Sequence, residues 1–106
     1  MIKPVPKPSH KRRVPKRSKR GKFDEVTRKR IIDRDEGKCQ ECGQRGTEIH
    51  HVFYKSRGGR GVYTNGLLLC YLCHRRLHDN ADLSNKWISI FHDKYGANFY
   101  KDEFDV

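Results

Sequence analysis

Residues 38–80 read KCQECGQRGTEIHHVFYKSRGGRGVYTNGLLLCYLCHRRLHDN and contain two pairs of cysteines, Cys39-x2-Cys42 and Cys70-x2-Cys73. Each pair has the spacing of a metal-binding knuckle. In a reducing compartment, two such pairs are typical of one tetrahedral zinc site rather than of two disulfides. The sequence therefore predicts a structural Zn2+ bound by all four cysteines. The spacer between the pairs is longer than a simple zinc ribbon needs, which indicates an inserted element.

The insert has the pattern of a β-hairpin. Residues 47–54, TEIHHVFY, are rich in β-branched and aromatic side chains and predict a strand. A second strand is expected at 67–69, directly after Asn65-Gly66, a dipeptide that favours a tight turn. Residues 55–63, KSRGGRGVY, would form a flexible, basic, glycine-rich loop between the strands.

Three helices are expected around this hairpin. Residues 70–79 place His74 and His78 four positions apart, so that both imidazoles project from one face. Residues 23–35 can start at an Asp24 cap and end before Gly37. Residues 82–95 carry an apolar stripe at helical spacing, which predicts a core-facing helix.

The histidines indicate a second metal site. Neighbouring side chains of a strand point to opposite faces, so His50 and His51 cannot have the same role. One of them can join His74 and His78 in a three-imidazole cluster, which leaves a coordination position open as in catalytic metal sites. The other can take a proton from water at neutral pH. Glu48 lies on the same strand face as His50 and is expected to accept from a ligand histidine or to pair with an arginine.

This arrangement resembles the HNH endonucleases, the ββα-metal or His-Me finger nucleases, over about residues 38–80. The resemblance implies a small α+β fold with a ββα-metal core, a four-cysteine zinc knuckle and flanking helices. It also implies a metal-dependent DNA endonuclease in which His51 is the general base and Asn65 fixes the hairpin loop and orients His51. The catalytic divalent metal would be held by His50, His74 and His78.

The resemblance further implies cleavage of DNA that leaves a 5′-phosphate and a 3′-hydroxyl. A monomer with one site would nick one strand per catalytic event. The catalytic metal is expected to be Zn, Mn, Ni, Co or Mg, and an all-imidazole set suits the first four better than Mg, which prefers oxygen ligands.

Other interpretations of the same residues stay open at this point. His50 and His51 could exchange roles, because strand parity alone does not assign them. Asn65 could be only a turn residue, and His74 and His78 only polar residues beside the zinc knuckle. The alternative function is a zinc-ribbon DNA-binding module without catalysis, which would leave the histidines and Asn65 unexplained.

The charge is concentrated at the N-terminus. The chain of 106 residues has 24 Lys plus Arg against 13 Asp plus Glu, a net charge of +11. Residues 1–22 hold ten of the basic residues, all four prolines and no acid, which predicts a disordered basic arm. Residues 23–106 would form the nuclease domain, with a terminal helix at about 82–95. Basic residues expected to contact DNA beside the metal are Lys55, Arg57, Arg60, Arg75 and Arg76.

Length and hydropathy exclude several classes of protein. The chain suits one small domain, has no apolar run that could span a membrane, and shows no signal peptide at its N-terminus. A cytoplasmic location is therefore expected. Small HNH proteins with two cysteine pairs resemble those of bacteriophages, so the expected setting is a bacterial host, with DNA packaging beside terminase, homing or restriction as possible roles. The oligomeric state stays open.

Overall fold

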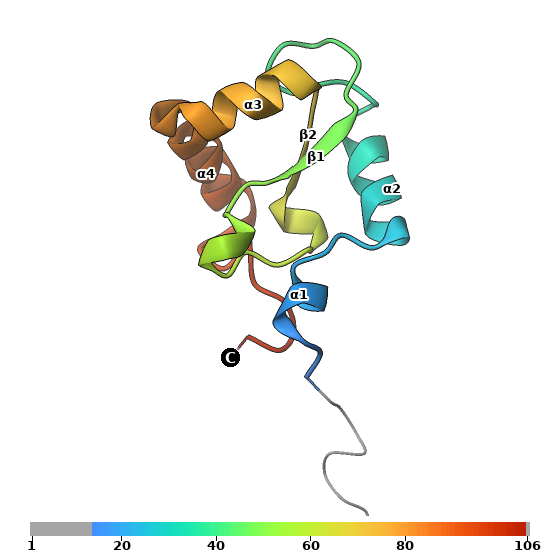
Figure 1. Ribbon diagram of the computed structural model, residues 1–106, viewed down its shortest axis with the longest axis vertical. Helices are drawn as coiled ribbons and strands as arrows, with labels where there is room; N and C mark the ends of the chain where they lie inside the picture. Colours follow the sequence, from blue (N-terminus) through green and yellow to red (C-terminus); the bar gives the residue numbers. More distant parts are fainter. Residues whose placement is uncertain (1–13, 106) are drawn as a thin grey trace, which may run out of the picture.

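The computed structural model describes residues 14–105 and arranges them around a single β-hairpin (Figure 1). The first half of the chain holds helices α1 (Arg17–Arg20) and α2 (Glu25–Arg34) and strand β1 (Glu48–His51). Two 3-10 turns, η2 (Lys55–Arg57) and η3 (Tyr63–Asn65), lead to strand β2 (Gly66–Leu69). Helices α3 (Tyr71–Asp79) and α4 (Ala81–Tyr95) follow. This small α+β architecture confirms the expected fold class.

The hairpin is antiparallel, with Glu48 opposite Leu69 and His51 opposite Gly66. Ile49 and Leu68 lie on one face and pack with Ile31 of α2. The other face packs against α3 and α4 through Leu67 and Leu69, and because both faces are covered, every residue of β2 is buried. This two-sided burial explains why GLLL has no polar alternation.

Helix α2 begins where the sequence predicts it. The Asp24 carboxylate accepts a hydrogen bond from the Thr27 N–H at 2.7 Å, and Glu25 occupies the first turn. The helix ends at Arg34, after which Glu36 and Gly37 both take positive φ and turn the chain toward the first knuckle.

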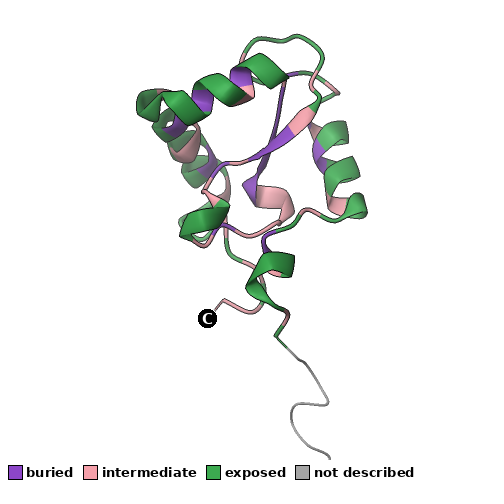
Figure 2. Cartoon of the chain, viewed as in Figure 1, coloured by how far each residue is buried: buried purple, intermediate pink, exposed green. Residues whose placement is uncertain are grey.

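Helices α3 and α4 cover the second face of the hairpin. Leu77 of α3 and Phe91 of α4 are buried in one cluster with Leu67 and Leu69. The expected stripe of residues on α4 is core, because Leu83, Trp87, Ile88 and Tyr95 pack against that cluster. Figure 2 shows the buried surfaces turned inward and the outer helix faces exposed.

The loop between the strands is packed rather than flexible, contrary to expectation. The added Cβ of any side chain at Gly59 would lie 1.8 Å from the Phe53 carbonyl oxygen. At Gly61 it would lie 2.1 Å from the Lys22 carbonyl oxygen. These glycines therefore serve close backbone approach, not mobility.

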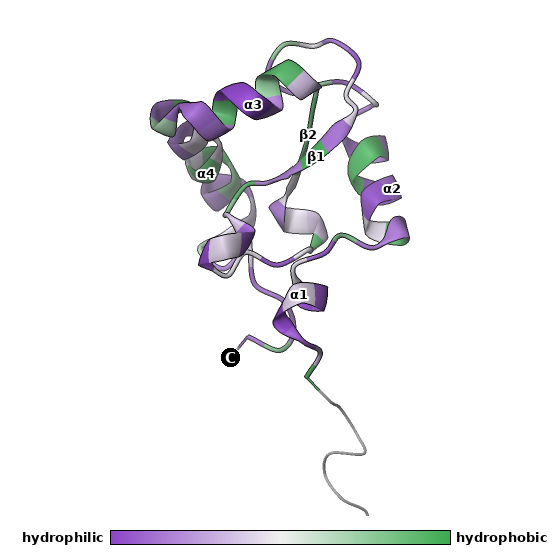
Figure 3. Cartoon of the chain, in the orientation of Figure 1, coloured by the Kyte–Doolittle hydropathy of each residue, from purple (hydrophilic) through white to green (hydrophobic). Residues whose placement is uncertain are grey.

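Residues 14–22 also differ from the expected disordered arm. They include helix α1, a hydrophilic turn (Figure 3), and Gly21 is buried. The physical reason is a set of ion pairs with the C-terminal segment, which lies beside α1 in Figure 1. Residues 1–13 lie outside the described residues, so a disordered basic arm stays a prediction for that segment. The division of the chain into an arm and a nuclease domain also stays a prediction. Within residues 14–105, no helix is long and apolar enough to cross a membrane.

Candidate functional site

The four cysteines meet where the segment after α2 passes the start of α3. One sulfur from each of Cys39, Cys42, Cys70 and Cys73 lies within 4.8 Å of the others. The Sγ atoms of Cys42 and Cys70 are 3.7 Å apart, far longer than a disulfide bond. Sulfurs bound tetrahedrally to zinc lie about 3.8 Å apart. The cluster therefore has the dimensions of a four-cysteine zinc site.

The local backbone favours the thiolate of Cys39, whereas the pKa values of Cys42 and Cys73 are raised in the absence of a metal. Burial raises the pKa of the Cys39 thiol, but backbone N–H groups of Cys70, Cys42 and Glu41 stabilise its thiolate and bring the pKa down to about 7. Gly43 closes the first knuckle at φ 82° and donates its N–H to the Cys39 carbonyl oxygen at 2.8 Å. A metal cation bound at the centre of the cluster would displace the remaining thiol protons.

Three imidazoles meet on the α3 side of the hairpin. Ring nitrogens of His50, His74 and His78 all lie within 4.8 Å of one another. The Nε2 atoms of His74 and His78 are 3.3 Å apart, which is about the separation of two nitrogens bound to a tetrahedral metal. The Nε2 atom of His50 is buried and has no hydrogen-bond partner. An orphaned buried nitrogen is costly unless it binds something, so this observation fits a metal ligand.

Two further features of the surroundings, a carboxylate contact and burial, act on the imidazoles of this cluster. The Nδ1 atom of His74 lies 2.6 Å from Oε1 of Glu48. A carboxylate only accepts, so Nδ1–H donates and Nε2 keeps the lone pair that a metal needs. Of the two partners expected for Glu48, an arginine or a histidine of the cluster, the structure shows the histidine. Burial, followed by the neighbouring His74 and His78, lowers the pKa of His50 to about 3, so His50 is neutral at physiological pH.

His51 leaves the strand on the opposite face, as strand parity predicts. Its Nε2–H donates to the Gly21 carbonyl oxygen at 2.5 Å, and its ring stacks on Phe23 with centroids 4.3 Å apart. A carbonyl oxygen only accepts, so Nδ1 is the nitrogen with the lone pair. Burial lowers the pKa of His51, and the positive charge of Lys55 lowers it further. The hydrogen bond to Gly21 raises the pKa and offsets part of this effect. His51 is thus a neutral imidazole with a fixed tautomer.

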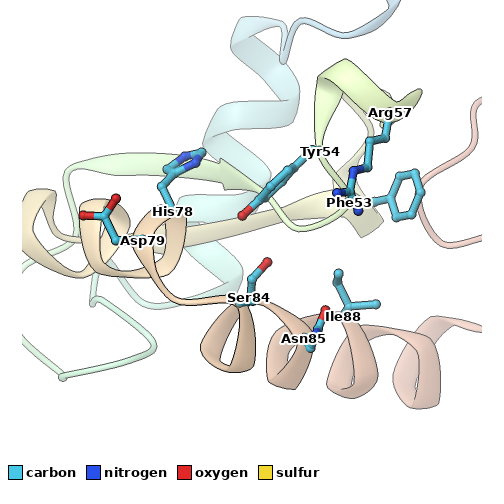
Figure 4. A pocket seen from close by; sticks show the side chains of 9 residues that line it. Phe53, Tyr54, Arg57, His78, Asp79, Ser84, Asn85 and Ile88 are labelled. Carbon is cyan, nitrogen blue, oxygen red and sulfur yellow. The ribbon is translucent and has the colours of Figure 1, made fainter.

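The three histidines of the cluster and His51 line one cavity of about 400 Å³. The rest of its wall comes from Ile49, Tyr54, Lys55 and Ser56. A second cavity of about 300 Å³ adjoins it and shares Tyr54 and His78. Figure 4 shows this second cavity between Tyr54 and His78 on one side and Ser84, Asn85 and Ile88 of α4 on the other. The three-imidazole cluster, His51 and polar side chains therefore lie at contiguous cavities.

A family profile described as HNH endonuclease matches residues 39–80, the segment that carries both clusters and the hairpin. Over this segment the chain is similar to the HNH endonuclease family. It is also distantly similar to the type IV methyl-directed restriction enzyme EcoKMcrA of Escherichia coli strain K12, with 32% identity over 65 residues. That alignment covers 52% of this chain but 24% of the restriction enzyme, so the chain spans about a quarter of the length of this curated relative.

The HNH segment contains Asn65, whose side chain is bound by the backbone of the hairpin loop. Asn65 is fully buried. Its Oδ1 accepts from the Phe53 N–H at 2.8 Å, while Nδ2 donates to the carbonyl oxygens of Phe53 and Arg60. Asn65 thus ties Phe53 to Arg60 across the loop of the hairpin. Asn65 does not orient His51 through a direct hydrogen bond, because the polar atoms of its side chain bind Phe53 and Arg60 while Nε2 of His51 binds Gly21.

The basic residues of the HNH domain divide into two groups. Lys55 borders the histidine cavity, Arg57 borders the adjoining cavity, and Arg75 and Arg76 are exposed on α3. Arg60 was expected to contact DNA but instead pairs with Asp105 at 3.0 Å and is 13% exposed. Its partner lies 45 residues further along the chain, beyond any local pattern.

Three contributors to the HNH site were missed by the sequence analysis: Gly21, Phe23 and Tyr54. Gly21 and Phe23 contact His51 from the segment expected to be an arm or its border. The Tyr54 ring stacks on His78 with centroids 5.4 Å apart. An aromatic residue beside the loop is a weak signal for Tyr54, and nothing in the sequence marks a backbone carbonyl such as that of Gly21.

Proposed function

We propose that this HNH domain hydrolyses phosphodiester bonds of DNA at the His50–His74–His78 cluster, with His51 as the general base. One observation carries the proposal. The unpartnered Nε2 of His50 lies in a cluster with two further imidazoles, and the cavity that they line also contains His51. A metal-binding position and a neutral base at one cavity are the two parts that hydrolysis requires.

The three ligand histidines are prepared by the protein to bind a divalent cation. Such a cation, when bound, supplies charge to stabilise the phosphate and the departing oxygen. Glu48 orients the His74 ring, and burial keeps His50 neutral, so His50 does not have to lose a proton near pH 7. The all-imidazole set favours Zn, Mn, Co or Ni over Mg.

His51 takes the proton from the attacking water. Its Nδ1 holds the lone pair, since Nε2–H is committed to the Gly21 carbonyl. The lowered pKa keeps the imidazole unprotonated at neutral pH, and the stacked Phe23 ring limits its rotation. A fixed, neutral base of this kind needs no reorganisation before the reaction.

Basic residues around the cavity suit a polyanionic substrate. Lys55 borders the histidine cavity, and Arg17, Lys19 and Lys22 border shallow hollows that Lys55 also lines. Arg17 Nη2 donates to the Ser56 carbonyl oxygen at 3.0 Å, which holds this basic surface beside the site. Such side chains neutralise phosphates near the scissile bond, so cleavage would weaken with salt.

Within the described residues there is one three-histidine cluster per chain. A monomer would therefore cut one strand in each event, which is nicking. The similar restriction enzyme makes a restriction role the one we favour for the domain, and the expected terminase partner is not part of this proposal.

A zinc-ribbon module that binds DNA without cutting it is the second candidate, favoured by the four-cysteine cluster and the basic surface. A supercoiled-plasmid assay over Zn, Mn, Co, Ni and Mg separates the two functions. The nuclease predicts conversion to relaxed circles with at least one metal. Binding of the plasmid without relaxation under every metal would support the module.

A further inference from the structure

We propose that four residues, Arg20, Arg60, Asp102 and Asp105, form an ion-pair network that positions the general base, and we call this network the clasp. The two arginines bind the two aspartates, and this fixes the segment after Arg20 so that the Gly21 carbonyl oxygen faces His51. This inference rests on the proposed function. It makes Arg20, Arg60, Asp102 and Asp105 positioning residues of the nuclease, although none of them lines the histidine cavity.

The clasp is an alternating network of two arginines and two aspartates. Arg20 binds Asp102 through two parallel hydrogen bonds of 2.9 and 2.8 Å and reaches Asp105 at 3.0 Å. Arg60 binds both oxygens of Asp105 at 3.0 Å. The side chains are only 12–21% exposed. Paired, planar contacts of this kind fix orientation as well as distance.

The C-terminal half of the clasp is preformed. The backbone N–H of Asp102 donates to Asp105, and the N–H of Phe104 donates to Asp102. The Arg20 guanidinium also lies 5.7 Å from the centre of the Phe104 ring. The carboxylates are thus held in place by their own turn and can act as an anchor for the N-terminal segment.

Arg20 is fixed at its backbone as well as at its side chain. Its carbonyl oxygen accepts from the Gly61 N–H at 2.8 Å, and the Gly21 N–H donates to Arg17 at 3.1 Å. The next peptide group carries the carbonyl that binds His51. Because successive peptide groups are joined by only two soft torsions, fixing Arg20 largely fixes the direction of the Gly21 carbonyl.

Residues 21–23 supply both contacts that define the His51 ring, the hydrogen bond at Nε2 and the stacked Phe23. Strand β1 supplies only the point of attachment. The base is therefore assembled from three distant parts of the chain, namely the hairpin, the N-terminal segment and the C-terminal segment.

Two kinds of variant open the clasp in the full-length protein. Arg20→Ala and Asp102→Ala remove charged partners, and the double variant should be no worse than the more severe single one if they act as a unit. Gly61→Ala acts differently, because its Cβ would lie 2.1 Å from the Lys22 carbonyl oxygen and must displace residues 21–23. Asp93→Asn, an exposed position on α4, is the matched control.

The test combines plasmid kinetics with NMR of the histidine rings. The clasp variants should lose on the order of 10²-fold in kcat, with KM within about twofold and Co2+ still bound at both metal sites. The His51 Nε2–H resonance should disappear or show a mixture of tautomers, while Asp93→Asn keeps it. Wild-type kcat together with an unchanged His51 tautomer in Arg20→Ala and Gly61→Ala would overturn the clasp. An inactive wild type that still shows the Nε2–H resonance and loses it in the variants would contradict the proposed function but support the clasp.

Discussion

The Nδ1 atom of His74 in helix α3 lies 2.6 Å from Oε1 of Glu48 in strand β1, although the two residues are 26 positions apart in the chain. The contact fixes which nitrogen of His74 faces the other two imidazoles. It links the strand that carries His50 to the helix that carries the other two ligands, so the three-histidine cluster is organised by one carboxylate as well as by the fold.

Glu48→Gln should lower metal affinity at the three-histidine cluster by about 10- to 100-fold, because the amide keeps the shape but loses the charge that supports His74. Competition titration with Co2+ measures the affinity, and Glu25→Gln on the exposed side of α2 is the control. Unchanged affinity in Glu48→Gln would show that the carboxylate does not prepare the ligand.

The two metal sites should respond differently to substitution. Cys39→Ser, or removal of zinc by a chelator, should unfold the domain, because a small core is supplemented by metal binding. His78→Ala should retain the fold, since His78 is exposed, but bind one metal per chain where the wild type binds two. Metal analysis with thermal unfolding followed by circular dichroism checks both. A wild type that binds no zinc would contradict the four-cysteine assignment.

Much of this site is encoded by local patterns, and the rest is not. Cysteine spacing, strand parity at His50 and His51, and the i, i+4 spacing on α3 identify both clusters, because each depends on neighbours in sequence. The hydrogen bond of His51 to Gly21 joins residues 30 apart, and that of Arg60 to Asp105 joins residues 45 apart. A basic residue in the sequence indicates a DNA contact only if no carboxylate of the fold pairs with it. Arg60 was therefore expected to contact DNA and the segment around Arg20 to be disordered, whereas both arginines pair with aspartates near the C-terminus.

Asn65→Ala should destabilise the fold by about 1–3 kcal/mol, because the loss of a buried amide leaves the Phe53 N–H and two carbonyl oxygens without their partner. Urea unfolding with zinc present measures the change. Should Asn65→Ala instead keep its stability and lose activity, a direct role of Asn65 at the base would be restored.

The clasp predicts an acid-sensitive contribution to stability. The hydrogen bonds from Arg20 lower the pKa of Asp102, and those from Arg60 lower the pKa of Asp105. A carboxyl with a depressed folded-state pKa stabilises the fold above its unfolded pKa of about 3.9, and this contribution is lost as the pH falls through the lower folded value.

The difference in unfolding free energy between the wild type and the Asp102→Asn/Asp105→Asn double variant should therefore be constant from pH 7 to about pH 5 and shrink below about pH 4. Both proteins carry the four-cysteine cluster, so acid release of zinc largely cancels in the difference. A difference that grows as the pH falls would contradict the ion pairs.

The most direct test of the proposed nuclease compares wild type with His51→Ala on supercoiled plasmid, using the metal that gives the fastest relaxation. Among the described residues, His51 is in neither the four-cysteine cluster nor the three-histidine cluster, so the variant should bind DNA and both metals like the wild type. Relaxation that falls by about 10²-fold or more in the variant is the predicted result. Relaxation at the wild-type rate would contradict His51 as the general base.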